Sequence, residues 1–191
     1  MRRWKCLSST DVVKDRWLRL SADRCELPSG LILDPYYVLH DAEWVHVMAM
    51  DAVGDILVVR QYRYAGNAVC TELPGGIVDA GEDVLIAAQR ELAEETGYTA
   101  AKWDYVGWLF ANPARQTNKV HLLLAQELSP SSSQALDASE DIEFEFLPMD
   151  YIQQAIETGH FSQALHVASF YRALNFLAMR RDASLTLRSI Y

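Results

Sequence analysis

One stretch, residues 75–98, constrains the fold of this chain of 191 residues more than any other. It starts with Gly75-Gly76, passes through a polar turn to Glu82, and ends with Arg90-Glu91-Leu92-Ala93-Glu94-Glu95-Thr96-Gly97-Tyr98. Glycine permits backbone conformations that other residues resist, so the start of the stretch predicts a loop. Gly97 suits the left-handed position that follows the last helical residue. The stretch therefore predicts a glycine-rich loop that opens a helix.

Three carboxylates lie in the last turns of the predicted helix. At 100° per residue, Glu91, Glu94 and Glu95 share an arc of roughly 100°. Like charges at these spacings destabilise an isolated helix, and acidic residues near its C-terminus oppose the helix dipole. A divalent cation such as Mg²⁺ or Mn²⁺ would offset both the repulsion and the unfavourable interaction with the dipole, because such ions prefer carboxylate ligands. The alternative is a solvated acidic face. The side chains predicted to face the core beside this arc are Leu85, Ala88 and Leu92.

The complete spacing carries a resemblance to a known family. Gly76 is followed by five residues, Glu82, seven residues, Arg90-Glu91, an apolar residue, any residue, Glu94-Glu95, any residue and Gly97. In this pattern the chain resembles the Nudix hydrolases, which hydrolyse a diphosphate linked to another moiety. Tyr98 departs from the aliphatic residue that the family usually has. The resemblance covers residues 44–180 and implies an α/β fold, an α/β/α sandwich with a mixed sheet.

The resemblance also implies roles for individual residues. Mg²⁺, with Mn²⁺ as a substitute, is the implied cofactor, because metal ions neutralise phosphate oxygens and acidify bound water. The implied metal ligands are Glu91, Glu94 and Glu95, with the Gly75 carbonyl and Glu82 as further candidates. Arg90 is expected to pair with a motif carboxylate and to fix its rotamer, as residues behind a metal site do. The expected catalytic residues are Glu94, Glu95, Arg90 and a general base.

The general base in the related branch is often a glutamate on a loop after the motif. Glu140 is the candidate at that place. Asp137, Asp141 and Glu143 are alternatives. All four residues could instead be solvated side chains at the start of a strand.

Further residues suggest the substrate. Glu72-Leu73-Pro74-Gly75-Gly76 and Arg60-Gln61-Tyr62-Arg63 resemble the branch that hydrolyses ADP-ribose and other nucleoside diphosphate sugars. Pro113 lies close to a downstream proline associated with ADP-ribose hydrolases. Arg63 and Arg115 are candidate phosphate contacts, because a guanidinium matches phosphate oxygens, although each could be a surface arginine. The aromatic candidates for stacking on a base, each of which could instead belong to the core, are Trp4, Trp17, Tyr36, Tyr37 and Trp44.

The leading hypothesis is Mg²⁺-dependent hydrolysis of the pyrophosphate bond of such a sugar, giving a nucleoside monophosphate and a sugar phosphate. One alternative keeps the chemistry and changes the substrate to dinucleoside polyphosphates or damaged nucleotides. Another is a Nudix-fold regulator that binds nucleotides without hydrolysing them. The last is disfavoured because all four motif carboxylates are present.

Composition limits the partners. The net charge of −9 and the pI near 5.0 disfavour nucleic acid and anionic membranes. No apolar run is long enough to span a membrane, and no apolar signal segment follows the basic start, so we expect a cytoplasmic protein. The three cysteines, Cys6, Cys25 and Cys70, are widely spaced and predict free, buried thiols. The five histidines show no ligand spacing and are predicted to be structural.

The rest of the chain predicts strands and two further helices around the motif. Residues 1–43 are expected to form an extension with strands at 17–25 and 31–39, which by resemblance helps to form a homodimer. Residues 44–180 form the expected Nudix domain, and 181–191 a flexible tail. Predicted strands in that domain are 44–50, 56–60, 70–73, 103–110, 119–125 and 142–147. Predicted helices run from an Asp150 cap through Ile156 and from Phe161 to about Arg180, the latter with a core face of Val167, Phe170, Leu174, Leu177 and Ala178.

Overall fold

The computed structural model describes residues 2–131 and 133–188 of the chain. The chain divides into two compact units. Unit 1 consists of Met1–Glu43 and Leu109–Lys119, and unit 2 of Trp44–Trp108 and Val120–Tyr191.

Unit 1 contains a three-stranded antiparallel sheet in the order β1-β2-β3. The strands are β1 (Lys5–Lys14), β2 (Arg19–Glu26) and β3 (Ile32–Leu39). The predicted antiparallel extension is confirmed, but β1 was missed. Its centre, Ser8-Ser9-Thr10-Asp11, is polar throughout and lacks the alternation that identifies a strand. Unit 1 also includes Leu109–Lys119, a segment within the range of the predicted Nudix domain.

Unit 2 is built on a seven-stranded sheet with the order β10-β5-β4-β9-β8, in which β6 pairs with β5 and β7 pairs with β4. Strand β4 runs parallel to β9 and antiparallel to β5 and β7, so the sheet is mixed, as predicted. The short β7 was predicted as a loop. The strands are β4 (Trp44–Met50), β5 (Ile56–Arg63), β6 (Ala68–Glu72), β7 (Gly75–Ile77), β8 (Tyr98–Phe110), β9 (Lys119–Pro130) and β10 (Ile142–Leu147).

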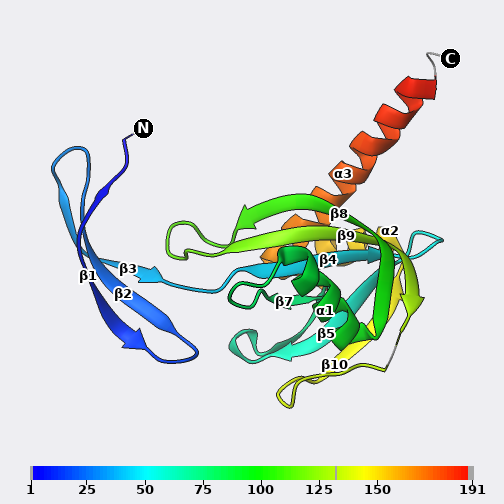
Figure 1. Cartoon of the computed structure of the whole chain (residues 1–191), viewed down its shortest axis with the longest axis horizontal. Helices are drawn as coiled ribbons and strands as arrows, with labels where there is room; N and C mark the ends of the chain where they lie inside the picture. The colour runs from blue at the N-terminus through cyan, green and yellow to red at the C-terminus, as the bar shows by residue number, and fades with distance from the viewer. Residues whose placement is uncertain (1, 132, 189–191) are drawn as a thin grey trace. The chain divides into compact units, whose positions relative to one another are not determined.

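Helices cover both faces of this sheet (Figure 1). Helix α1 (Val84–Thr96) packs on one face, where Val45, Val47 and Ala49 of β4 meet Ala88 and Leu92. Helices α2 (Met149–Thr158) and α3 (Ala164–Arg188) pack on the other, against Met48 and its neighbours. Because β4 is buried on both sides, its sequence is almost continuously apolar. The predicted α/β/α sandwich is confirmed.

Helix α1 begins and ends with local signals. The Asp83 carboxylate accepts hydrogen bonds from the N–H groups of Leu85 and Ile86, and Gly97 adopts the predicted left-handed conformation with φ 72°. Ala88 and Leu92 are buried as predicted, but Leu85 is 39% exposed. The buried arc includes Glu91 and Glu95 themselves, so its centre lies nearer the carboxylates than predicted.

The last two helices differ from prediction at their ends. Helix α2 starts after Pro148, and Asp150 lies in its first turn rather than capping it, where it still favours the positive end of the dipole. Helix α3 continues past Arg180 to Arg188, because no glycine or proline interrupts residues 181–188. Of its predicted core residues, Val167, Phe170, Leu174 and Leu177 do pack against the core. The prediction was wrong for Ala178, which is exposed. Residues 189–191 of the predicted tail lie outside the described residues.

The cysteines differ from prediction in their burial. All three are free, but only Cys25 is buried, while Cys6 is exposed and Cys70 is intermediate. Cys6 is exposed because it lies in β1, every residue of which is exposed.

Candidate active site

A cleft of about 560 Å³ lies in unit 2 and gathers most of the predicted site residues. Its lining comes from β4, β5, β7, α1, α3 and the loops before α1 and before β10. Predicted site residues that line it are Trp44, Arg63, Gly75, Arg90, Glu91, Glu94, Glu95 and Glu140.

Three other predicted site residues are not part of the lining of the cleft. Glu82 does not line the cleft and instead bonds to Arg90. Pro113 and Arg115 belong to unit 1, where Arg115 lines a separate small cavity of about 160 Å³ with Tyr36 and Tyr37. Proximity to the motif in the sequence does not determine on which unit a loop folds. Roles for Pro113 and Arg115 at the cleft therefore stay predictions.

The two glycines of the motif let β7 approach the carboxylates of α1. Gly75 and Gly76 pair with His46 and Val45 of β4. The Gly75 N–H donates a hydrogen bond to Glu95 Oε2 at 2.8 Å. A Cβ atom on Gly76 would lie 2.5 Å from the Glu91 carboxylate. The absence of a side chain at position 76 therefore makes room for the Glu91 carboxylate.

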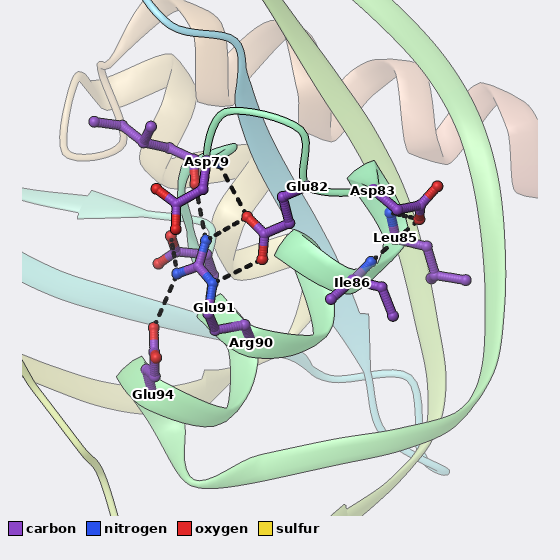
Figure 2. A network of polar contacts seen from close by, with 9 residues as sticks. Asp79, Glu82, Asp83, Leu85, Ile86, Arg90, Glu91 and Glu94 are labelled. Carbon is purple, nitrogen blue, oxygen red and sulfur yellow. Dashed lines mark hydrogen bonds and ion pairs between the residues drawn. The ribbon is translucent and has the colours of Figure 1, made fainter.

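Arg90 ties the motif together, as Figure 2 shows. Its Nε donates to Glu82 Oε1 at 3.0 Å, and its Nη1 donates to Glu91 at 2.8 Å and to Glu94 at 3.1 Å. Its Nη2 also donates to the Ile77 carbonyl. The bonds from Arg90 lower the pKa of Glu82 and raise that of Arg90 itself. One guanidinium thus fixes the glycine loop against the helix.

Glu91 and Glu95 are buried carboxylates at the floor of the cleft. Burial raises the pKa of Glu91 and raises that of Glu95 to about 8, because the ionised form loses its water. A hard divalent cation would favour the ionised form of both groups, and carboxylate oxygens are the ligands that such a cation prefers. Within residues 2–131 and 133–188, no three acidic, imidazole or thiol side chains already converge on a metal-binding point.

A loop anchored to the C-terminal end of α1 carries Glu140. Ser131 donates to the Gly97 carbonyl, and the Ala135 N–H donates to that of Glu94. Gln134 Nε2 donates to the carbonyls of Glu95 at 2.6 Å and Ile142 at 3.0 Å, so it joins the helix end to the start of β10. These bonds satisfy carbonyls that a helix end leaves unpaired. No local sequence pattern predicts this role of Gln134.

The anchored loop brings two of the four candidate bases to the cleft. Asp137 and Glu140 line it, whereas Asp141 and Glu143 do not. The Asp137 N–H donates to the Glu140 carboxylate, and the Glu140 N–H donates to the Asp137 carbonyl. After burial, which is the largest cause, the charge of Glu140 also raises the pKa of both Glu91 and Glu95, so it lies near them.

Three buried polar side chains near Arg63 carried no recognisable signal in the sequence. Arg63 pairs with Glu72, Glu72 lies beside His166, and the ring of His166 stacks on His46 at 3.8 Å. His46 and His166 were predicted to be structural, yet both line the cleft. Burial lowers the pKa of His166 to about 3 and lowers that of His46 well below its usual value. Both rings are therefore neutral at pH 7.

The buried ring of His166 predicts a loss of stability in acid. In the unfolded chain a histidine has its ordinary pKa near 6.5, so below that pH the unfolded state binds a proton that the folded state refuses until about pH 3. Between pH 6.5 and pH 5 this should lower the free energy of unfolding by about 2 kcal/mol. Urea unfolding of the wild type and of His166→Asn at both pH values measures the difference. Parallel pH dependence in the two proteins would contradict the prediction.

Two family profiles together cover most of the chain. The NUDIX domain profile matches residues 40–167, which include the glycine loop, the three carboxylates and the whole cleft floor. The chain belongs to the Nudix family. This Nudix hydrolase also matches, over residues 4–39, the profile of the nucleoside diphosphate sugar hydrolase N-terminal domain. The predicted resemblance is confirmed, and the enzyme is a pyrophosphohydrolase of this family.

Individual relatives match along most of their length. The ADP-ribose pyrophosphatase of Bacillus subtilis (strain 168) is 28% identical over 177 residues, covering 92% of this chain and 93% of that protein. The methanol dehydrogenase activator of Bacillus methanolicus is 30% identical over 154 residues, covering 80% and 83%. A crystal structure of an ADP compounds hydrolase superposes with a TM-score of 0.82 at 23% identity, covering 94% of this chain and 97% of that one. The last match shows a shared fold.

Proposed function

We propose that this Nudix hydrolase splits the pyrophosphate bond of ADP-ribose or a related nucleoside diphosphate sugar, with Mg²⁺ as cofactor and Mn²⁺ as a substitute. The products would be a nucleoside monophosphate and a sugar phosphate. The observation that carries this proposal is the match of residues 4–39 to the N-terminal domain of nucleoside diphosphate sugar hydrolases. The name of the Bacillus subtilis relative supports the same substrate class.

The chemistry follows from the residues at the cleft. When bound, a divalent cation supplies charge neutralisation of the phosphate oxygens and acidifies water. Glu91, Glu94 and Glu95, together with the Gly75 carbonyl, are the proposed ligands, and Arg90 holds two of these carboxylates in place. Glu140 accepts a proton from the attacking water. Arg63, which also lines the cleft, contacts the diphosphate, and Trp44 of the same lining stacks on the base or sugar.

Replacing Glu140 by glutamine tests the general base. The amide cannot accept the proton of water, so kcat should fall by about 100-fold or more. Affinity for Mn²⁺, measured by calorimetry, should change little, because Glu140 is not a proposed ligand. Asp141→Asn is the matched control, since Asp141 is adjacent in sequence and does not line the cleft. Normal turnover of Glu140→Gln with loss of turnover in Asp137→Asn would move the role to Asp137.

A product assay tests the function itself. The protein is incubated with Mg²⁺ and, separately, ADP-ribose, ADP-glucose, GDP-mannose, UDP-glucose, diadenosine tetraphosphate and NADH, and the products are separated by chromatography. Release of a nucleoside monophosphate and a sugar phosphate from one of the first four supports the proposal. Turnover of the dinucleotides alone would keep the Nudix chemistry and refute the proposed substrate class. No turnover with either Mg²⁺ or Mn²⁺ would favour another substrate or a binding role.

Homodimerisation through residues 1–43 is a separate proposal, motivated by the sheet of unit 1, whose strand β1 is exposed along its whole length. Light scattering at micromolar concentration should give about twice the chain mass of 21.6 kDa. A monomeric mass would refute it.

The cellular location is also a proposal, and we expect the cytoplasm. In the part of the chain that the structure describes, no helix combines the length and apolar character needed to cross a membrane.

A further inference from the structure

Arg63 is held in a fixed orientation at the wall of the cleft. Its Nε lies 3.1 Å from Glu72 Oε1 and 3.2 Å from Oε2, and its Nη2 also donates to Oε2. The Arg63 side chain remains 47% exposed, whereas that of Glu72 is 1% exposed. A carboxylate buried behind an accessible guanidinium therefore determines the plane in which Arg63 meets the cleft.

Glu72 is in turn fixed by His166 of α3. The Leu73 N–H donates to His166 Nδ1 at 3.1 Å, so the proton of the neutral ring lies on Nε2. Nε2 faces Glu72 Oε2 at 3.5 Å. The ring is held from behind by the stacked His46, whose Nδ1 lies 3.0 Å from Ser169 Oγ. A chain of contacts thus runs from α3 through Glu72 to Arg63.

This arrangement has a physical cost that a purely structural role would not require. A carboxylate buried without water must be paired and hydrogen-bonded, and an apolar residue would often serve stability as well. A bidentate pair, however, removes the rotational freedom of an arginine before a ligand arrives, which strengthens binding. We propose that Glu72 and His166 are positioning residues that orient Arg63 toward the diphosphate of the substrate. This inference rests on the proposed function.

Kinetics with ADP-ribose test the assignment. Glu72→Gln should raise KM by about tenfold, the cost of one charged hydrogen bond, with kcat changed less than about twofold, because Arg63 binds ground state and transition state alike. Arg63→Ala should raise KM at least as much. The double variant Arg63→Ala/Glu72→Gln should match Arg63→Ala alone, since Glu72 acts only through Arg63. His166→Asn should shift KM in the same direction by a smaller factor.

Asp104→Asn is the matched control, because Asp104 pairs with Arg180 at 2.6 Å outside the cleft and should leave KM and kcat unchanged. An unchanged KM in Glu72→Gln, or multiplicative effects in the double variant, would overturn the assignment. If the wild type does not hydrolyse ADP-ribose, the proposed function fails separately. The same variants are then titrated with inorganic pyrophosphate by calorimetry, where equal affinity of wild type and Glu72→Gln overturns the assignment and a tenfold loss supports it.

A second, independent observation concerns two cysteines of unit 1. Cys6 of β1 and Cys25 of β2 are register partners in the antiparallel sheet, and both thiols are free. Partners in such a pair have Cα atoms about 4.5–5.5 Å apart and side chains on the same face. Disulfides need about 4.4–6.8 Å. After burial, the charge of Cys6 also raises the pKa of the Cys25 thiol, which agrees with this closeness.

We infer that Cys6 and Cys25 are a redox-active pair whose oxidation forms a disulfide between β1 and β2. The exposed Cys6 thiolate attacks one sulfur of a low-molecular-weight disulfide, and one small thiol leaves. The Cys25 thiolate then attacks the Cys6 sulfur of the mixed disulfide, and the second small thiol leaves. Two protein thiols are oxidised and one small disulfide is reduced to two thiols, which take up the two protons.

Incubation of the full chain with glutathione disulfide, followed by alkylation and peptide mass mapping, tests this site. We expect a peptide pair joined through Cys6 and Cys25, with Cys70 alkylated as the internal control. Cys25→Ser should instead keep glutathione on Cys6. Stable glutathionylation of Cys6 in the wild type, or alkylation of both thiols, would overturn the inference.

Discussion

Replacing Glu95 by glutamine is expected to remove most turnover while making the metal-free protein more stable. The amide can still accept the hydrogen bond from the Gly75 N–H, so the local fold should persist. It is a poor ligand for a hard cation, whose stabilisation of the transition state is worth several kcal/mol, so turnover should fall by about a thousandfold or more. Steady-state kinetics with saturating Mg²⁺ measure this loss.

The gain in stability follows from the pKa of Glu95. Burial raises that pKa from 4.5 to about 8, so above pH 4.5 the unfolded state ionises while the folded state keeps its proton. Stability is therefore lost as the pH rises through this window, by about 3 kcal/mol at pH 7. Glutamine does not titrate, and urea unfolding in a chelator at pH 7 should show a higher free energy of unfolding for the variant.

With Mg²⁺ bound, the wild type should become more stable than Glu95→Gln. Added Mg²⁺ should stabilise the wild type by binding its folded state and should stabilise Glu95→Gln much less. Glu157→Gln, an exposed change on α2, serves as control and should leave turnover and stability unchanged. Near-normal turnover of Glu95→Gln would refute the ligand assignment, and a less stable metal-free variant would refute the account of its burial.

The parts of this site that were predicted correctly depend on local sequence. The spacing of the motif placed three carboxylates at one end of a helix, and Gly97 marked the end of that helix. Alternation and apolar runs predicted most strands of unit 2, because a strand buried on both faces, such as β4, has few polar residues. These signals span a few residues and survive in any tertiary context.

The parts that were missed depend on contacts between distant segments. Leu73 and His166 are separated by 93 positions, and their hydrogen bond exists because α3 packs against the sheet. A lone histidine in a sequence carries no sign of such a partner. Gln134 likewise bridges α1 and β10 only after both have formed. Strand β1 was missed for another reason, since an exposed polar strand lacks the hydrophobic alternation on which prediction rests.

Gly76→Ala should lose activity while keeping the fold, because glycine at this position leaves room for the carboxylate of a proposed metal ligand. A Cβ at position 76 would lie 2.5 Å from the carboxylate of Glu91. That group is the far end of a flexible side chain, so it can rotate away at little cost to folding. A proposed metal ligand is then misplaced, and a displacement of this size can lower turnover by about 100-fold.

Two neighbouring changes separate this effect from damage to the backbone. A Cβ on Gly75 would lie 2.0 Å from the Val45 carbonyl oxygen, so Gly75→Ala must distort the pairing of β7 with β4 and should lower the melting temperature. Gly66→Ala meets no atom within 4 Å and should change neither property. Thermal unfolding should therefore show Gly75→Ala as the least stable of the three variants. Kinetics should show that Gly76→Ala loses activity without a comparable loss of stability. If Gly76→Ala loses as much stability as Gly75→Ala, the Glu91 carboxylate cannot rotate away. Glycine is then needed at position 76 for folding and not only for activity.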